Sequence, residues 1–224
     1  MTSKLSEFWN NRYSLQPNTA KFKPFKGLDD KSGKHLVFLF RMTSSTIASR
    51  IENVQNALSE SKAFIPFPRD YFHMTFKVWG FLNDRKKTPD DISSEELKEV
   101  MSEMPERLSN FRRFEVALKR INLFPSVVFI EVADGGKGAE INRALIGMRG
   151  VNARWSDHPN YVPHISIGTF RNGRKIEDLI RIAESRRDCQ IGNAIIDRVE
   201  LVFVRWHKSE FPMFEPLKSV ELPI

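Results

Sequence analysis

Cysteine and long apolar runs are almost absent from this 224-residue sequence, and each absence excludes a class of protein. Cys189 is the only cysteine, so the chain can form no internal disulfide and no cysteine-based zinc site. The longest apolar run, residues 36–40, has the length of one strand and falls far short of the roughly 18 residues that span a bilayer. Residues 1–32 also lack the apolar stretch of a secretory signal. We therefore expect a cytoplasmic protein without membrane contact.

The sequence has many charged residues, and the basic ones outnumber the acidic ones. Charged residues make up 28% of the chain against 41% hydrophobic residues, a balance typical of a folded domain. The formal net charge is +7, which favours polyanionic partners such as nucleic acid or nucleotides. The basic residues are spread in small groups: Arg85-Lys86-Lys87, Arg112-Arg113, Lys119-Arg120, Arg171 with Arg174-Lys175, and Arg186-Arg187. Solvated surface is the better account of any single group, so the charge indicates a substrate class without deciding it.

Strand and helix signals alternate along nearly the whole chain. Alternating or β-rich apolar residues predict strands at 36–42, 71–81, 114–124, 127–133, 164–170, 194–204 and 216–222. Apolar spacings of three and four predict helices at 46–60 with Ser45 or Thr46 as cap, at 93–105, from Gly138 onward, and around 176–183. Ser93 with Glu96 forms a capping box, and Pro105 is expected to end that helix.

The order of elements repeats, which predicts two similar lobes. His164 follows His73 by 91 positions, and the same shift moves residues 37–38 onto 128–129 and the helix at 46–60 onto 137–151. We therefore expect an α+β fold of two pseudo-symmetric lobes, each an antiparallel or mixed sheet with helices, with the active-site cleft between them. The expected lobes are residues 33–125 and 126–224 of one bilobal domain, and residues 1–32 are expected to be an N-terminal extension packed on that domain.

The two central predicted strands each carry a histidine, any residue, a hydroxyl residue and then a hydrophobic residue. Residues two apart in a strand point to the same face, so His73 shares a face with Thr75 and His164 shares one with Ser166. A pseudo-two-fold that brings these strands together would place two imidazoles and two hydroxyls in one cleft. Each lobe would then present an acid–base group beside a hydrogen-bond donor.

Such a cleft suits phosphodiester chemistry. Imidazole titrates near pH 6.5, so one histidine can remove a proton from the attacking oxygen while the other gives a proton to the departing oxygen. Thr75 and Ser166 would donate hydrogen bonds to the non-bridging phosphate oxygens and stabilise the charge that builds there. The scheme needs no metal and no cofactor. We therefore predict His73 and His164 as catalytic residues, with Thr75 and Ser166 binding the phosphate.

The paired motifs, His73–Phe76 and His164–Ile167, resemble those of the 2H phosphoesterase superfamily, which contains 2′-5′ RNA ligase-like and RNA cyclic phosphodiesterase proteins. The flanking residues that resemble the family pattern are Lys77, Gly80, Pro163 and Gly168. The resemblance covers residues 35–222, and its one departure is Ser166 where threonine is commoner. The resemblance implies metal-independent cleavage of 2′,3′-cyclic phosphates or 2′-5′ linkages, and therefore an RNA or nucleotide substrate.

Several other residues are candidates for binding that substrate. By simple alternation Tyr71, Lys77 and Trp79 share the face of His73, while Tyr161 and Arg171 flank the second motif. A lysine or arginine would hold a phosphate, and an aromatic ring would stack on a base. Exposed strand ends are an equally good account of these residues.

The remaining signals favour ordinary structural roles. His35 and His207 flank strands, and His158 lies in a loop that could border the cleft. A metal site of His73, His158 and His164 is conceivable because imidazole is a common ligand, but it is disfavoured because no carboxylate or cysteine stands nearby at ligand spacing. The glycine-rich residues 134–138 lack the spacing of a phosphate-binding P-loop and predict a turn.

The sequence therefore predicts a phosphoric diester hydrolase that works as a monomer on RNA or nucleotides. The same two motifs are compatible with three alternative functions. These are 2′-5′ RNA ligation (the reverse reaction), trimming of RNA 3′ ends, and binding of a nucleotide without turnover. A scaffold role for residues 1–32 is a fourth. Two titratable imidazoles at equivalent positions favour chemistry over binding alone.

Overall fold

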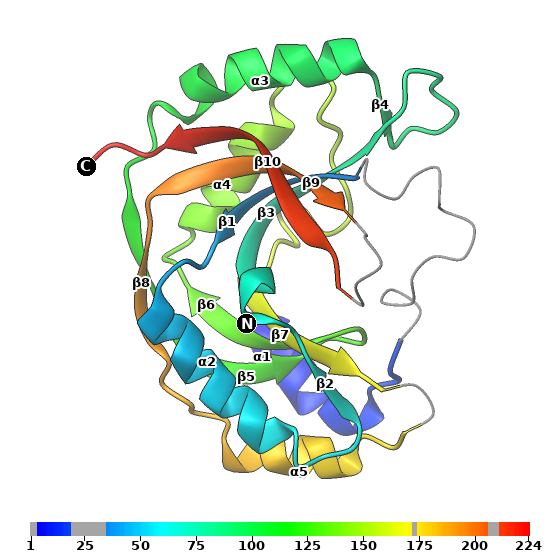
Figure 1. Cartoon of the computed structure of the whole chain (residues 1–224), viewed down its shortest axis with the longest axis vertical. Coiled ribbons are helices and arrows are strands. Elements are labelled where there is room, and N and C mark those ends of the chain that lie inside the picture. Colours follow the sequence, from blue (N-terminus) through cyan, green and yellow to red (C-terminus); the bar gives the residue numbers. More distant parts are fainter. Residues whose placement is uncertain (1–3, 19–34, 172–173, 206–210) are drawn as a thin grey trace.

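The computed structural model describes residues 4–18, 35–171, 174–205 and 211–224, which form an α+β fold (Figure 1). The strands are β1 (His35–Arg41), β2 (Phe64–Pro66), β3 (His73–Leu82), β4 (Asp91–Ile92), β5 (Phe114–Leu123), β6 (Val128–Ala133), β7 (His164–Phe170), β8 (Gly192–Ile196), β9 (Arg198–Arg205) and β10 (Met213–Glu221). The α-helices are α1 (Lys4–Asn10), α2 (Ser45–Leu58), α3 (Ser94–Leu108), α4 (Lys137–Ile146) and α5 (Glu177–Ser185). Among these residues no helix is long and apolar enough to cross a membrane.

All the strands belong to one curled sheet with the order β10-β9-β1-β3-β7-β6-β5-β8. The short β2 pairs with β7, and β4 pairs with β3. At the middle of the sheet β3 and β7 share one paired position, Met74 opposite Ile165. The sheet is therefore two half-sheets: the first contains β10, β9, β1 and β3, and the second contains β7, β6, β5 and β8.

The half-sheets do not follow the lobe boundary expected at residue 125. Strand β5 lies before that boundary, yet it pairs with β6 and β8 in the second half-sheet. Strand β9 lies after it, yet it pairs with β1 in the first. The helices exchange in the same way, because α2 packs on β7 and α4 packs on β3. Apolar alternation shows which residues are buried but not which half-sheet buries them, so the exchange is invisible in the sequence.

Both motif strands carry a β-bulge at the last residue of the motif. On β3, Thr75 pairs with Leu39 and Lys77 with Phe38, which leaves Phe76 as an extra residue. On β7 the register shifts at the equivalent point, between the residues paired with Phe129 and with Val128. The strands that pair with the two motifs repeat at a slightly different interval. Leu39 of β1 pairs with Thr75 and Phe129 of β6 pairs with Ser166, so these partners are 90 residues apart, whereas the two histidines are 91 residues apart. A bulge reverses the alternation beyond it, so the bulge at Phe76 redirects Lys77, and a second shift follows in the same strand at Trp79.

Several predicted element boundaries change in the structure, and three of these changes are instructive. Ser44, rather than Ser45 or Thr46, caps α2 by accepting a hydrogen bond from the Ile47 amide. The predicted strand at 194–204 breaks at residue 197, and its pieces β8 and β9 lie at opposite sides of the sheet.

Helix α3 begins at the predicted capping box but does not end at Pro105. It continues to Leu108, whose side chain is fully buried. Arg107 in this last turn donates hydrogen bonds to Glu103 and to the Gly147 carbonyl. These contacts hold the last turn in place although Pro105 supplies no amide hydrogen.

Candidate active site

The four motif residues lie together where the two half-sheets meet. Because Met74 opposes Ile165 in an antiparallel pair, His73 stands across from Ser166 and Thr75 stands across from His164. All four side chains are half-buried, whereas Met74 and Ile165 between them point into the core. His73 and His164 are diagonal neighbours, and such neighbours lie about 7–8 Å apart in a sheet. A phosphate group fits between two imidazoles at that separation.

Each imidazole is held in the same way by its own backbone. The Nδ1 atom of His73 lies 2.5 Å from the Tyr71 carbonyl oxygen, and that of His164 lies 2.8 Å from the Val162 carbonyl oxygen. A carbonyl only accepts hydrogen bonds, so Nδ1 carries the hydrogen in both rings. In the neutral form Nε2 therefore has a free lone pair, and in the charged form it has a proton to give.

Aromatic rings flank both imidazoles. The His73 ring makes edge contacts with Tyr71 at 4.9 Å and with Phe214 of β10 at 4.6 Å between ring centroids. The His164 ring makes edge contacts with Phe124 at 5.0 Å and with Phe129 at 5.3 Å. These rings fix the imidazole planes and exclude water from their sides.

Burial lowers the pKa of both imidazoles below the ordinary value of 6.5. For His73 the pKa falls to about 4, because burial outweighs the hydrogen bond to Tyr71 and the nearby His164 adds a further decrease. For His164 burial again dominates and the Val162 carbonyl opposes it. Both rings are consequently neutral near pH 7. An anionic phosphate between them would favour the charged form of one ring.

The hydroxyl groups of Thr75 and Ser166 complete the cluster. Within the described part of the chain neither hydroxyl makes a hydrogen bond to another residue. Both are therefore free to donate to an oxygen atom placed between the histidines. Two proton-transfer groups and two neutral donors around one small space can act on a tetrahedral anion.

The outer strands place opposite charges beside the two histidines. Arg41 opposes His73 in the β1–β3 pair and forms an ion pair with a β9 carboxylate 2.5 Å away. Glu131 opposes His164 in the β6–β7 pair and forms an ion pair with Arg187 at 2.6 Å. The two halves of the site therefore share the same geometry, but the residue opposite the histidine is positively charged in one half and negatively charged in the other.

A family profile covers the strands that carry this cluster. The profile of the 2′-5′ RNA ligase superfamily matches residues 43–208, well over half of the chain, and includes both motifs. The chain belongs to the 2′-5′ RNA ligase superfamily. The resemblance to 2H phosphoesterases that the two short motifs predicted is thereby confirmed, and so is the α+β fold.

Three proteins that are similar to this chain are distant from it in sequence. The RNA 2′,3′-cyclic phosphodiesterase of Methanothermobacter thermautotrophicus is 20% identical over 161 residues, which are 69% of this chain and 82% of that protein. The crystal structure of E. coli LigT in its apo form matches with a TM-score of 0.60 and 13% identity, covering 86% of this chain and 99% of LigT. The structure of TT0787 of Thermus thermophilus matches with a TM-score of 0.59 and 17% identity, covering 84% and 97%. These structures share the fold.

Lys77 does not share the face of the histidine cluster, contrary to the prediction from simple alternation. The bulge at Phe76 turns Lys77 and Trp79 to the opposite face of β3, where both are buried. The Lys77 ammonium lies 2.6 Å from Asp157 Oδ2, and Asn142 of α4 donates to the other carboxylate oxygen at 2.9 Å. Lys77 thus belongs to a buried ion pair that holds the loop leading into β7.

The two predicted tyrosines lie in different places. Tyr71 lies beside His73 and stacks on Phe214 with ring centroids 5.3 Å apart, and burial raises the pKa of its hydroxyl. Tyr161 is committed elsewhere, because its hydroxyl donates to the Thr75 carbonyl at 2.8 Å. This hydrogen bond anchors β3 at a position where β3 and β7 do not pair. Tyr71 keeps its place next to the site, whereas Tyr161 supports the strand.

Arg171 lies at the opposite end of β7 from His164. His164 begins that strand and Arg171 follows its last residue, which separates them by roughly 20 Å at the usual rise per residue. The Arg171 guanidinium is exposed and donates to the Lys62 carbonyl at 3.2 Å. The prediction of Arg171 as a phosphate contact is not supported by this placement.

The other histidines lie apart from the pair. His35 stacks on Phe81 at 4.7 Å, and burial lowers its pKa to about 4. His158 is exposed, and its amide donates to Asn142. His207 lies outside the described residues. Among the residues that are described, no three histidine, cysteine, aspartate or glutamate side chains gather as a metal site would require.

Sequence reasoning missed Phe124 and Phe214, the rings against the two histidines. Phe124 ends the predicted strand at 114–124 and alternates with Asn122, so its orientation was readable. The sequence could not predict the contact of Phe124 with His164, because that contact depends on the pairing of β5 within the second half-sheet. Phe214 reaches His73 only through the pairing of β10 with β9.

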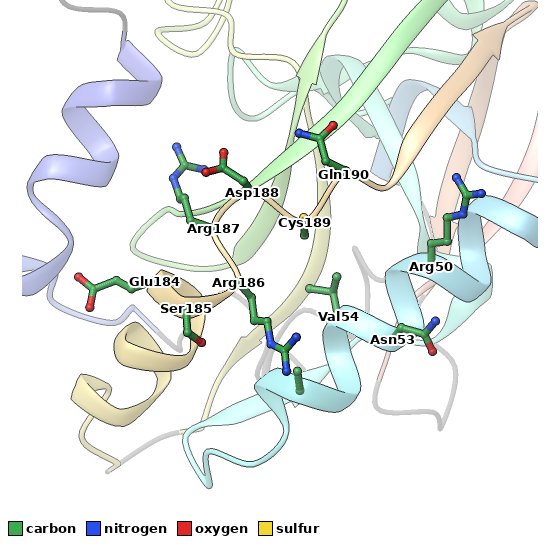
Figure 2. Close-up of a pocket in the computed structure, with 11 residues that line it drawn as sticks. Arg50, Asn53, Val54, Glu184, Ser185, Arg186, Arg187, Asp188, Cys189 and Gln190 are labelled. Atoms are coloured by element: carbon green, nitrogen blue, oxygen red, sulfur yellow. The ribbon is translucent and has the colours of Figure 1, made fainter.

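A separate polar groove of about 540 Å³ lies between α2 and the segment that joins α5 to β8 (Figure 2). Its basic residues are Arg50, Arg186 and Arg187, and Cys189 lines it as well. No residue of the two motifs borders it. The groove is therefore distinct from the histidine cluster.

Proposed function

We propose that this protein hydrolyses phosphodiesters at RNA or nucleotide ends, most directly 2′,3′-cyclic phosphates, with His73 and His164 as the acid–base pair. The observation that carries the proposal is the diagonal placement of the two histidines, each with Nδ1 bound to a carbonyl and Nε2 free. Membership of the 2′-5′ RNA ligase superfamily and similarity to an RNA 2′,3′-cyclic phosphodiesterase support it.

The reaction follows from the roles of the two Nε2 atoms. One neutral imidazole accepts a proton from water as the water oxygen bonds to phosphorus. The opposite imidazolium donates its proton to the ribose oxygen as the bond between that oxygen and phosphorus breaks. Thr75 and Ser166 donate hydrogen bonds to the non-bridging oxygens, which carry more negative charge in the transition state. The products are a phosphate monoester and a free ribose hydroxyl, and no metal ion enters the scheme.

The surroundings of the pair suit a nucleotide. Phe124 and Phe214 are partly exposed and lie against the two histidines, so each can stack on a base next to the phosphate. The net charge of +7 attracts a polyanion from a distance. Structures of E. coli LigT were determined with 3′-AMP and with ATP, which supports a nucleotide as the ligand class of this fold.

The test is hydrolysis of the four nucleoside 2′,3′-cyclic monophosphates in the presence of EDTA. We expect turnover to persist in EDTA and to fall about 10²–10⁴-fold in His73→Ala and in His164→Ala, with little change in ligand affinity. His158→Ala is the matched control, because this histidine is exposed and outside the pair. The position of the product phosphate identifies which ester bond breaks.

Different outcomes separate this proposal from its alternatives. Absence of turnover with all four nucleotides, and with 2′-5′ oligonucleotides, would leave nucleotide binding without chemistry as the better account. Cleavage of 2′-5′ linkages together with joining of cyclic phosphate ends would place the ligation reaction on the same two histidines. Loss of activity in EDTA that zinc or magnesium restores would refute the metal-independent scheme.

A further inference from the structure

The N-terminal segment, residues 4–18, lies outside the matched family profile, which begins at residue 43. The chain covers 99% of E. coli LigT with 86% of its own length, so it carries residues beyond the shared fold. The segment forms α1 and a short 3-10 helix, Arg12–Ser14, and α1 packs on β5. Its described residues therefore need an explanation of their own.

Helix α1 lies on the catalytic face of the second half-sheet. Glu131 opposes His164 in the β6–β7 pair, so their side chains share that face. Asn122 of β5 is fully buried, and its Nδ2 donates both to Glu131 Oε1 at 2.7 Å and to the Leu5 carbonyl of α1 at 2.8 Å. Asn122 thus joins the helix to the strand neighbour of His164.

An aromatic route connects α1 to the imidazole itself. The Phe8 ring meets Phe124 edge-on with centroids 4.8 Å apart, and Phe124 meets His164 edge-on at 5.0 Å. Phe124 also stacks on Phe129 at 4.1 Å. Phe124 therefore contacts both the helix and the imidazole.

The next residue of α1 contacts the charged pair whose carboxylate residue, Glu131, is paired with His164 across the sheet. The Trp9 ring lies 4.2 Å from the Arg187 guanidinium and 4.5 Å from that of Arg12. Arg187 binds Glu131 at 2.6 Å, and the side chains of this pair are largely buried. Figure 2 shows Arg187 at the rim of the groove with its side chain directed toward α1. Trp9 thus covers the ion pair that flanks His164.

We propose that α1 is a positioning element of the active site, which orients His164 through Phe124 and through the Arg187–Glu131 pair. The first half-sheet has a different support, because Phe214 of β10 packs against His73. The two symmetric half-sites are consequently held by asymmetric means, and α1 acts on one histidine only. The kinetic part of this inference rests on the proposed function.

The test compares three substitutions in the full chain. Phe8→Ala removes the contact with Phe124, Phe8→Leu keeps much of the volume, and Tyr13→Phe is the control, since it removes only an exposed hydroxyl that donates to Glu184. For each folded variant we would measure kcat and KM with a cyclic nucleotide. The imidazole carbon–proton NMR signals would be recorded as well, and His73→Ala and His164→Ala would assign the two rings.

We expect Phe8→Ala to lower kcat about tenfold through misorientation of the imidazole, with KM changed by no more than about twofold. Its His164 signal should move while the His73 signal stays. Phe8→Leu should recover most of the rate, and Tyr13→Phe should match the wild type. A folded Phe8→Ala variant with unchanged kcat and an unchanged His164 signal would overturn the proposal, because α1 would then only add stability.

Two further arms keep the test decisive. If Phe8→Ala does not fold, Trp9→Leu probes the contact with the charged pair by the same criteria, since it keeps an apolar side chain but uncovers the Arg187–Glu131 pair. If the wild type turns over no substrate, the proposed function fails, and the NMR signals alone decide the role of α1. Movement of the His164 signal without the His73 signal then supports it, and movement of neither overturns it.

Discussion

Replacing Lys77 by methionine tests whether the bulge on β3 turns this lysine away from the histidine cluster. The Lys77 side chain is 0% exposed and its Asp157 partner is 4% exposed, with Nζ and Oδ2 2.6 Å apart. Burial lowers the pKa of Lys77, and its hydrogen bond to Asp157 opposes that shift. Methionine fills most of the alkyl volume and removes the charge, so the substitution isolates the loss of the ion pair.

The expected cost follows from what remains around Asp157. Breaking a buried pair by removing one partner costs about 3–5 kcal/mol, because the other charge stays buried and uncompensated. Asp157 keeps two donors, the Asn142 amide at 2.9 Å and the Arg154 backbone amide at 2.7 Å. Because these donors still satisfy Asp157, we expect Lys77→Met to lower the unfolding free energy by about 3 kcal/mol, the lower end of that range.

The assay is urea denaturation together with steady-state kinetics on the folded variant. Lys86→Met is the matched control, because its ion pair with Glu96 is exposed and is worth no more than about 1 kcal/mol. We expect Lys77→Met to lose stability while KM for a cyclic nucleotide stays unchanged. A raised KM with wild-type stability would refute the reasoning and would return Lys77 to the substrate.

Three further predictions concern pH, the end of β7 and its bulge. Because burial lowers the pKa of His73 to about 4 and also lowers that of His164, the fraction of free enzyme with one charged imidazole falls as pH rises. The maximum of kcat/KM should therefore lie below pH 6.5, and a plateau up to pH 8 would contradict these shifts. Arg171→Ala should leave kcat and KM for a cyclic mononucleotide unchanged, since Arg171 follows the far end of the strand; a KM increase above about fivefold, or roughly 1 kcal/mol, would place it in the site. Gly168→Ala should lower the unfolding free energy by at least about 2 kcal/mol in urea, because its Cβ would lie 2.7 Å from the Ile65 carbonyl; wild-type stability would mean that the strands can separate there.

The candidate site was predictable because its signals are local. A histidine and a hydroxyl two residues apart on a strand share a face whatever the strand pairs with. His73 with Thr75 and His164 with Ser166 are such pairs, and their recurrence in two equivalent strands indicated one shared site. Most strand and helix positions were predictable for the same reason, since apolar periodicity is a property of the segment itself.

Tertiary structure decided everything that depends on which segments meet. The bulge at Phe76 arises from the pairing of β3 with β1, and it sends Lys77 to Asp157 rather than to the substrate. The strand of Phe124 reaches His164 only because β5 crosses into the second half-sheet. A burial pattern shows that one face of a strand is covered, but it does not show which segment of the chain covers it. The sequence alone therefore determined which imidazole and hydroxyl side chains the candidate site contains, and long-range strand pairing determined which residues surround it.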